Sequence, residues 1–151
     1  MGLEIRFEGS NASDVARWLG SDIPCRHQGP GDLGERMQRA FLDAFQRGQT
    51  HVVLVGTDIP GLTCEMLSRA FDALRRCPVV LGPATDGGYY LIGARETVPD
   101  LFSGIAWGTP MVLHQTIEAA RSLDIHPELL DPLSDVDRPE DLSLFPSLCD
   151  G

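Results

Sequence analysis

The segment HVVLVGTDIPG, residues 51–61, is a short apolar run that stops on an acid and then on a proline. The continuous β-branched and aliphatic stretch 52–55 is typical of a strand that is covered on both faces of a parallel sheet. Asp58 follows the end of this predicted strand, and open α/β sheets bind ligands beyond the carboxyl ends of their strands. Alternatively, Asp58 only shapes a turn before Pro60, with its side chain as a local acceptor.

Helical and extended patterns alternate outward from this strand along the whole chain. Such alternation predicts an α/β fold with a largely parallel sheet, and no linker or repeat divides residues 1–151 into more than one domain. The expected elements are a half-exposed strand (3–7), a helix (10–20), a helix ending at Gly48 (28–48), the strand 52–55, a helix (62–76), two strands (78–83 and 87–93), a helix (109–123), a short strand (125–130) and a terminal helical turn (138–145).

Residues that favour helix starts stand before each predicted helix. Ser10 or Asn11 is expected to cap the first, and Thr63 the third. Thr109 is expected to cap the last long helix, with Pro110 as its first residue.

The segment QGPGDLGER, residues 28–36, has two possible roles. Asp32 and Glu35 have the spacing of a capping box, which by itself explains both residues. Gly29 and Gly31, placed before a helix with Arg36 nearby, could instead cradle an anion such as a phosphate. The segment matches neither the dinucleotide-binding nor the P-loop pattern, so both interpretations stay open.

The charge of the chain excludes several classes of partner. The formal net charge is -10 and all 12 basic residues are arginines, so we expect no nucleic-acid partner and no lysine-based chemistry. No apolar stretch approaches the roughly 20 residues of a membrane helix, and residues 1–10 lack the pattern of a signal peptide. We therefore expect a cytoplasmic protein without a membrane span.

Acidic motifs fall at the ends of predicted elements and suggest a metal. Asp58 lies in GTDIP, Asp86 in ATDGGYY, and Asp135 and Asp137 in LSDVDRPEDL. Carboxylates at the mouth of a sheet repel one another unless a cation is shared, and their hard oxygens suit Mg²⁺ or Mn²⁺ bound together with substrate phosphates. Each acid also has a local alternative, since Asp86 could turn the chain and Asp137 could cap a helix.

Glycines and aromatic residues near Asp86 are candidates for contact with a substrate. Gly87 and Gly88 would let a ligand approach the backbone closely, although a tight hairpin needs glycines equally. Trp107 could stack on a sugar or base, or act as a half-buried packing residue. Tyr89 and Tyr90 are expected on opposite faces of their strand, so only one of them should reach the cleft.

Five motifs, in their order and spacing, resemble a known family. They are QGPGDLGERM, VGTDIPGLT, VVLGPATDGGYYLIG, LFSGIAWGTP and DVDRPEDL. Together they resemble the bacterial glycosyltransferase-like proteins of the GT-A, or nucleotide-diphospho-sugar transferase, fold, often called selenodomain-associated or arsenosugar-type transferases. The resemblance covers nearly the whole chain and implies a Rossmann-like three-layer fold.

The resemblance also implies roles for individual residues. Asp58 would match the acid that carries Mg²⁺ or Mn²⁺, with Asp137 as a second metal ligand. Asp86 would be the general base, and Gly87 with Gly88 would face the donor sugar or the acceptor. The expected partners are a nucleotide sugar and a small-molecule acceptor.

The chain also departs from this family's pattern. Members usually begin with a further strand and a basic, glycine-containing loop that grips the nucleotide phosphates, whereas this sequence starts at what resembles the second strand. The sheet is therefore expected to have unpaired edges, which a homo-oligomer could cover. Two alternatives to a glycosyltransferase follow: a nucleotidyltransferase that joins a nucleoside triphosphate to a phosphorylated metabolite, and a non-catalytic oligomeric remnant of the fold.

Overall fold

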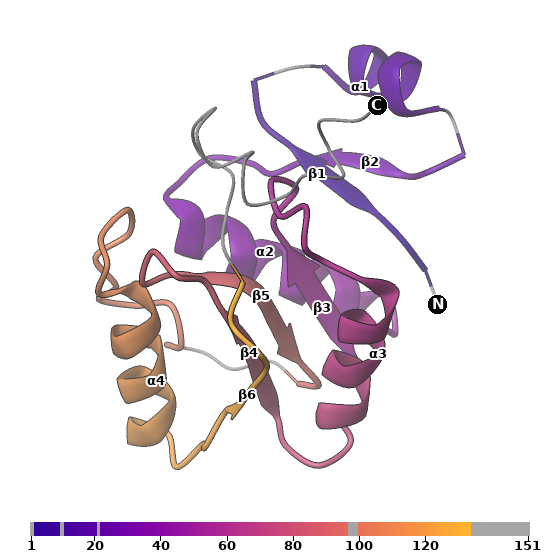
Figure 1. The fold of residues 1–151 in the computed structure, drawn as a ribbon. Helices are drawn as coiled ribbons and strands as arrows, with labels where there is room; N and C mark the ends of the chain where they lie inside the picture. Colours follow the sequence, from indigo (N-terminus) through magenta and orange to yellow (C-terminus); the bar gives the residue numbers. More distant parts are fainter. Residues whose placement is uncertain (1, 10, 21, 97–99, 134–151) are drawn as a thin grey trace.

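The computed structural model describes residues 2–9, 11–20, 22–96 and 100–133 (Figure 1). The predicted terminal turn 138–145 lies outside the described residues. The elements are β1 (Ile5–Phe7), α1 (Ala12–Leu19), β2 (Cys25–His27), α2 (Leu33–Gln46), β3 (Val52–Val55), α3 (Cys64–Ala73), β4 (Val79–Pro83), β5 (Tyr89–Ala94), α4 (Val112–Ser122) and β6 (Glu128–Leu129).

The strands form two sheets. In the larger sheet the order is β3-β5-β4-β6, and in the smaller one β1 pairs with β2 in parallel. β5 runs antiparallel to both β3 and β4, while β6 is parallel to β4. The prediction of a largely parallel sheet is therefore wrong for β5. The connection from β4 to β5 is a tight turn, and a connection that short can join only antiparallel strands.

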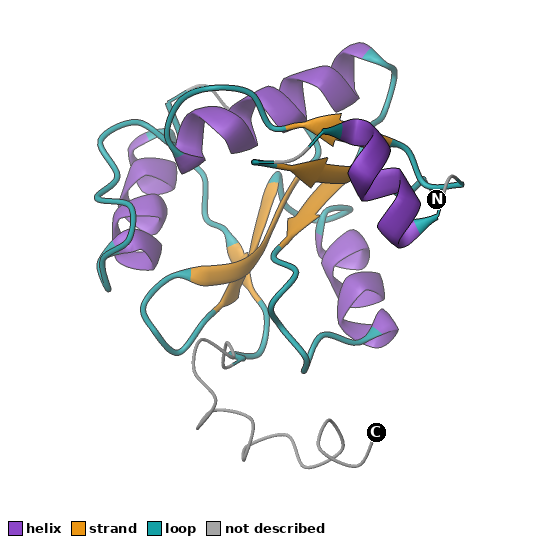
Figure 2. Ribbon diagram, turned by 90° about the horizontal axis from the view of Figure 1, so that it is seen from above, coloured by secondary structure: helices purple, strands orange, loops and turns teal. Residues whose placement is uncertain are grey.

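The larger sheet is the middle of three layers, with α2 and α4 on one face and α3 on the other (Figures 1 and 2). Alternate strand residues point to opposite faces, so each face has its own apolar cluster. The first cluster includes Phe41, Val79, Leu81, Ile92, Ala94 and Ala120. The second includes Ala70, Ala73, Leu74, Val80 and Leu91. This arrangement confirms the predicted three-layer α/β architecture.

Most helix starts follow the local sequence signals. The Asn11 side chain accepts a hydrogen bond from the Asp14 backbone, and the Thr63 hydroxyl caps α3 in the same manner. Asp32 and Glu35 form the complete capping box, with reciprocal side-chain-to-backbone hydrogen bonds of 2.9 and 2.7 Å. These predictions are confirmed because each depends only on residues one turn apart.

The predicted start of α4 is wrong. The helix begins at Val112 instead of Pro110, and Thr109 is not its N-cap. The backbone N–H of Leu113, in the first turn, donates at 2.9 Å to the carbonyl oxygen of Gly87 in a distant turn. The Thr109 hydroxyl still accepts from Met111 N at 3.3 Å, and the tertiary contact adds an acceptor for the first turn.

The two tyrosines lie on opposite faces of β5, as predicted, although a bulge changes which strand residues share a face with each of them. The register between β4 and β5 shifts at Gly82, leaving Tyr90 as an extra residue on β5. Such a bulge re-aims the side chain at the extra position. Tyr90 consequently packs with Leu91, whereas Tyr89 packs on the other face with Ile92.

The smaller sheet is anchored to α2 by ion pairs. Glu4 accepts from Arg47 at 2.6 Å and Arg6 donates to Asp43 at 2.9 Å. Among the described residues, β1 pairs only with β2 and β3 only with β5, in agreement with the expected unpaired edges.

Candidate functional site

The loops after β3 and β4 lie at one edge of the larger sheet. Val55 of β3 and Gly82 of β4 are both paired with Leu91 of the intervening β5, so the two strands end at the same level. The sheet register thus brings the loop of Asp58 and the turn of Asp86 to the same edge. This is the edge at which α/β sheets bind ligands.

The side chain of Asp58 is exposed to solvent. In the part of the chain that the structure describes, its carboxylate accepts no hydrogen bond and forms no ion pair. The next residue, Ile59, is only 7% exposed and anchors the loop in the core. The Ile59 carbonyl also accepts from Leu62 N at 3.1 Å, which closes the turn before α3. A fixed backbone therefore presents a free carboxylate to solvent.

Asp86 is exposed in the turn that joins β4 to β5. Its Oδ1 accepts a hydrogen bond of 2.8 Å from Gly88 N, so this side chain helps to form the turn. The backbone bonds Ala84 N to Gly88 O (3.0 Å) and Gly87 N to Ala84 O (3.2 Å) complete it. The local turn role foreseen for Asp86 is thus present, and it occupies one carboxylate oxygen.

Gly87 allows a close approach by the chain itself. Its φ is 93°, and an added Cβ would lie 2.2 Å from the carbonyl oxygen of Pro110. The segment before α4 therefore lies directly against the Asp86 turn. The requirement for glycine at this position is explained by Pro110, and the predicted contact of Gly87 and Gly88 with substrate stays a prediction.

The loop that carries Trp107 is held by Gln115, which the sequence analysis did not single out, and by Thr109, which was expected only to cap a helix. Gln115 of α4 accepts from Ala106 N at 2.7 Å, and the Thr109 hydroxyl donates to the Ala106 carbonyl at 2.7 Å. A glutamine in a helix gives no sequence signal for such a role, because the contact exists only after α4 packs beside the loop.

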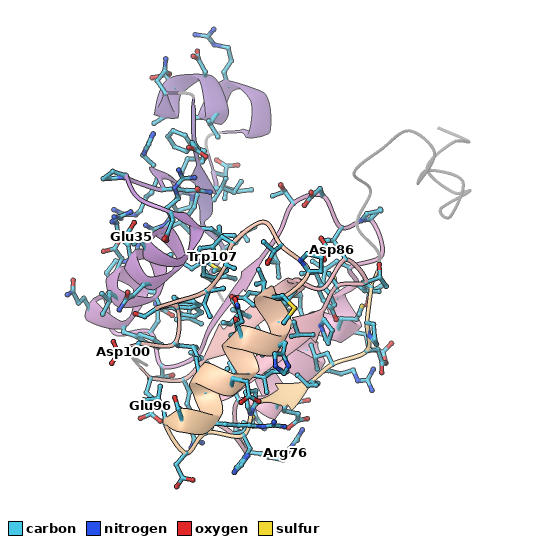
Figure 3. All side chains as sticks on the ribbon, turned by 90° about the vertical axis from the view of Figure 1, so that its left-hand side faces the viewer. Glu35, Arg76, Asp86, Glu96, Asp100 and Trp107 are labelled. Carbon is cyan, nitrogen blue, oxygen red and sulfur yellow. The ribbon has the colours of Figure 1, made fainter. Side chains whose placement is uncertain are left out.

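Trp107 lies against the N-terminal turn of α2. A Cβ on Gly34 would lie 2.7 Å from Cζ2 of the indole, and the ring centroid is 6.4 Å from that of Phe102. Beside the indole is an open cavity of about 250 Å³. Its lining residues are Asp32, Gly34, Glu35, Gln38, Phe102, Ser103, Gly104, Ile105 and Trp107. Figure 3 shows Trp107 between Glu35 and Asp86.

Arg36, a predicted anion-binding residue, is used within the protein. Its Nε donates to the carbonyl oxygen of Gly31 at 2.9 Å, and its Nη1 donates to Glu8 at 2.6 Å. Arg39, which the sequence analysis did not single out, braces the same loop by donating to Pro30 O at 2.9 Å. The two arginines thus stabilise the loop 28–31, and binding of an anion there by Gly31 and Arg36 stays a prediction.

One tyrosine hydroxyl at this edge is buried and the other is hydrogen-bonded within the protein. The Tyr89 hydroxyl is buried without a hydrogen-bond partner among the described residues, and this burial raises the pKa of Tyr89 far above its ordinary value. Burial also raises the pKa of Tyr90, whose hydroxyl donates to the carbonyl oxygen of Asp131 at 3.0 Å. Any contact of Tyr89 with a substrate would therefore involve its partly exposed ring.

The carboxylates at this edge have the chemistry of a hard-metal site, although the described residues contain no complete one. No three His, Cys, Asp or Glu side chains of that part of the chain gather closely enough to hold a metal ion. Mg²⁺ and Mn²⁺ need only one or two protein carboxylates, because waters and substrate phosphates complete their coordination. The uncommitted carboxylate of Asp58 fits this requirement, while Asp135 and Asp137 lie outside the described residues.

Comparisons with known proteins agree with this fold. A crystal structure of a "putative nucleotide-diphospho-sugar transferase" from Desulfovibrio desulfuricans G20 superposes with a TM-score of 0.85 at 39% sequence identity. The match covers 90% of this chain and 61% of that protein, so the chain spans less than two thirds of its relative. The likeness confirms the predicted GT-A, nucleotide-diphospho-sugar transferase fold.

The chain also matches the model of a protein family. No curated protein matches the chain, and no helix of the described part is long and apolar enough to cross a membrane. Residues 1–109 match the family model described as "Uncharacterized protein conserved in bacteria (DUF2064)". Because this match spans more than half of the 151 residues, the chain belongs to the DUF2064 family.

Proposed function

We propose that this chain carries the catalytic edge of a divalent-metal-dependent glycosyltransferase that uses a nucleotide-diphosphate sugar. The observation that carries the proposal is Asp58: an exposed carboxylate without a partner among the described residues, just beyond the carboxyl end of β3. Support comes from the fold, since a relative at 39% identity is named for nucleotide-diphospho-sugar transfer.

In this proposal Asp58 holds Mg²⁺ or Mn²⁺, and Asp137 is a further candidate ligand. When bound, the metal ion would neutralise the negative charge that develops on the departing diphosphate. Asp58 can serve this role without losing a structural contact, because it makes none with the described residues. Its anchored neighbour Ile59 keeps the carboxylate in place before any ligand arrives.

Asp86 is the proposed general base. Its carboxylate would take the proton of an acceptor hydroxyl as that oxygen bonds to the anomeric carbon of the sugar. The bond from that carbon to the diphosphate breaks, and the leaving nucleoside diphosphate keeps the electron pair. The bond from Gly88 N to Oδ1 fixes the carboxylate, and a positioned base of this kind contributes roughly 10² to 10⁴ in rate.

A binding experiment tests the metal site. Mn²⁺ binding is measured by electron paramagnetic resonance for the wild-type chain, for Asp58→Asn and for Asp72→Asn. Asp72 is the matched control, because it is an exposed aspartate on α3 whose ion pair with Arg75 is long, at 4.0 Å. We expect Asp58→Asn to abolish specific Mn²⁺ binding and Asp72→Asn to leave it unchanged. Equal binding by all three proteins would refute the role of Asp58.

A thermal-shift screen tests the donor. UDP-, GDP- and CDP-sugars and the nucleoside triphosphates are each added with and without Mn²⁺. A ligand at a hundred times its dissociation constant stabilises the folded state by about 2.7 kcal/mol. We expect one class of nucleotide sugar to raise Tm only with Mn²⁺. A shift from a triphosphate alone, with pyrophosphate release, would identify a nucleotidyltransferase, and no shift from any ligand would indicate a non-catalytic protein.

A further inference from the structure

The cavity beside Trp107 is separate from the acidic loops and has a lining of its own. Phe102, Ile105 and the indole of Trp107 form apolar walls. Asp32, Glu35 and Gln38 come from the first turns of α2 and provide acceptors, together with the Gln38 amide donor. Its volume of about 250 Å³ lies just below the roughly 300–1,000 Å³ of typical ligand pockets, so it has room only for a small ligand.

The polar groups of this cavity still have hydrogen-bonding capacity. The capping box uses Oδ1 of Asp32 and Oε2 of Glu35, which leaves the second oxygen of each carboxylate without a partner among the described residues. The Gln38 side chain likewise has no hydrogen bond within that part of the chain. A cavity lined by an aromatic side chain and by free acceptors suits a ligand that has both an apolar ring face and hydroxyl groups.

The charge of the cavity is acidic without a compensating cation. No arginine or histidine is among its lining residues in the described part of the chain. Arg36 and Arg39 belong to the same helix but donate to the Gly31 and Pro30 carbonyls and to Glu8. Two carboxylates therefore face the cavity alone, and they would repel an anionic ligand.

We propose that the cavity binds the acceptor of the transfer, and that the acceptor is a polyhydroxylated compound that carries no phosphate. This inference rests on the proposed function and adds the class of acceptor. It also disfavours the phosphorylated metabolite of the nucleotidyltransferase alternative.

The position of the cavity agrees with this role. Trp107 belongs to the segment whose Pro110 lies against Gly87 of the Asp86 turn. In the view of Figure 3 the label of Trp107 falls between those of Glu35 and Asp86. The loop that forms one wall of the cavity thus also packs against the turn of the proposed base.

The test uses the fluorescence of Trp107 itself. The chain has 2 tryptophans, so the Trp18→Phe background leaves Trp107 as the sole reporter. The probes are a panel of neutral hexoses, pentoses and glycerol, each titrated beside its phosphorylated counterpart. We expect at least one neutral member to change Trp107 fluorescence saturably, and its phosphorylated form to bind at least about tenfold more weakly, a difference of about 1.4 kcal/mol.

Two variants test the aromatic wall of the cavity and its negative charge separately. Gly34→Ala adds a methyl group whose carbon would lie 2.7 Å from the indole of Trp107. We expect this variant to bind the neutral ligand at least about tenfold more weakly. Glu35→Gln keeps a residue that can form the capping box but removes one negative charge. It should therefore reduce the difference in affinity between the neutral and the phosphorylated ligands. Asp58→Asn should leave neutral-ligand binding unchanged.

The outcomes distinguish this inference from the proposed function. No response to any neutral probe, or equal or tighter binding of the phosphorylated forms, would overturn the acceptor class even where Mn²⁺-dependent nucleotide-sugar binding is found. Neutral-ligand binding that is lost in Gly34→Ala, in a protein without nucleotide-sugar binding, would refute the transferase and support the ligand class of the cavity.

Discussion

Replacing Gly87 by alanine is expected to destabilise the protein more than any other exchange of a turn glycine outside the α2 loop. Gly87 has a φ of 93°, in the left-handed region that side chains disfavour, and the added Cβ would lie 2.2 Å from Pro110 O and 2.6 Å from Pro110 Cα. Both obstacles are backbone atoms, so the clash cannot be relieved by rotating a side chain. The segment before α4 must move away from the turn.

The expected loss in free energy of unfolding combines the strain of the backbone at Gly87 with the clash against Pro110. An alanine in the left-handed region costs about 1–2 kcal/mol, and forcing extra volume into a packed site costs typically about 1–3 kcal/mol. Gly87→Ala should therefore lower the free energy of unfolding by about 2–5 kcal/mol. Gly48→Ala is the matched control, because Gly48 has a similar φ of 89° but nothing within 4 Å of an added Cβ.

The assay is urea unfolding of the three proteins, followed by circular dichroism and by tryptophan fluorescence. Gly48→Ala should cost only the backbone contribution of about 1–2 kcal/mol. Gly87→Ala should cost more and should also change the Trp107 signal of the folded state, because Pro110 and Trp107 share one loop. Equal destabilisation by the two variants would refute the close approach of Pro110 to Gly87.

Three further predictions concern stability. Asp32→Ala removes the cap of α2 and should lower the free energy of unfolding by about 1 kcal/mol in urea, and no loss would contradict the capping box. Tyr90→Phe removes the hydrogen bond to Asp131 O, and a loss of about 1 kcal/mol is expected, whereas unchanged stability would show that this bond is not needed. Burial raises the pKa of Glu4, but hydrogen bonds such as that from Arg47 lower it more, so its folded pKa lies below the ordinary 4.5. Glu4 therefore stabilises the protein above that value and loses its contribution as pH falls through the folded pKa. The stability difference between wild type and Glu4→Gln should shrink from pH 7 to pH 3, and a constant difference would exclude this linkage.

Local signals in the sequence were sufficient to predict most of the helices and strands. The caps at Asn11, Asp32 and Thr63 each depend on a hydrogen bond to a residue three positions along the chain. The apolar spacing of α2 and the run of β3 likewise place residues on faces set by backbone geometry alone. Such features are decided within one or two turns, so they can be read without knowledge of the fold.

The failures occurred where distant segments meet. α4 begins at Val112, with its first turn bonded to Gly87 O, and Tyr90 shares a face with Leu91 instead of Ile92 because a bulge forms at Tyr90. A Cβ on Gly82 would lie 2.4 Å from the Tyr90 ring, so that glycine makes room for the re-aimed side chain. The antiparallel direction of β5 could have been predicted from the sequence, since the short Asp-Gly-Gly connection itself indicates a hairpin.

The sequence by itself determined the α/β class, the acidic loops at the strand ends and the oxygen chemistry that suits a divalent metal, while the three layers were implied by the family resemblance. The first three follow from the period of the apolar residues and from the residue types next to them. Only the tertiary structure decided that Arg36 serves the loop of Gly31 and that Trp107 forms a cavity with the first turns of α2. It also decided that Asp58 keeps a free carboxylate among the described residues. The reason is physical: a side chain's available hydrogen bonds and open space depend on neighbours that are remote in sequence and come together only when the chain has packed.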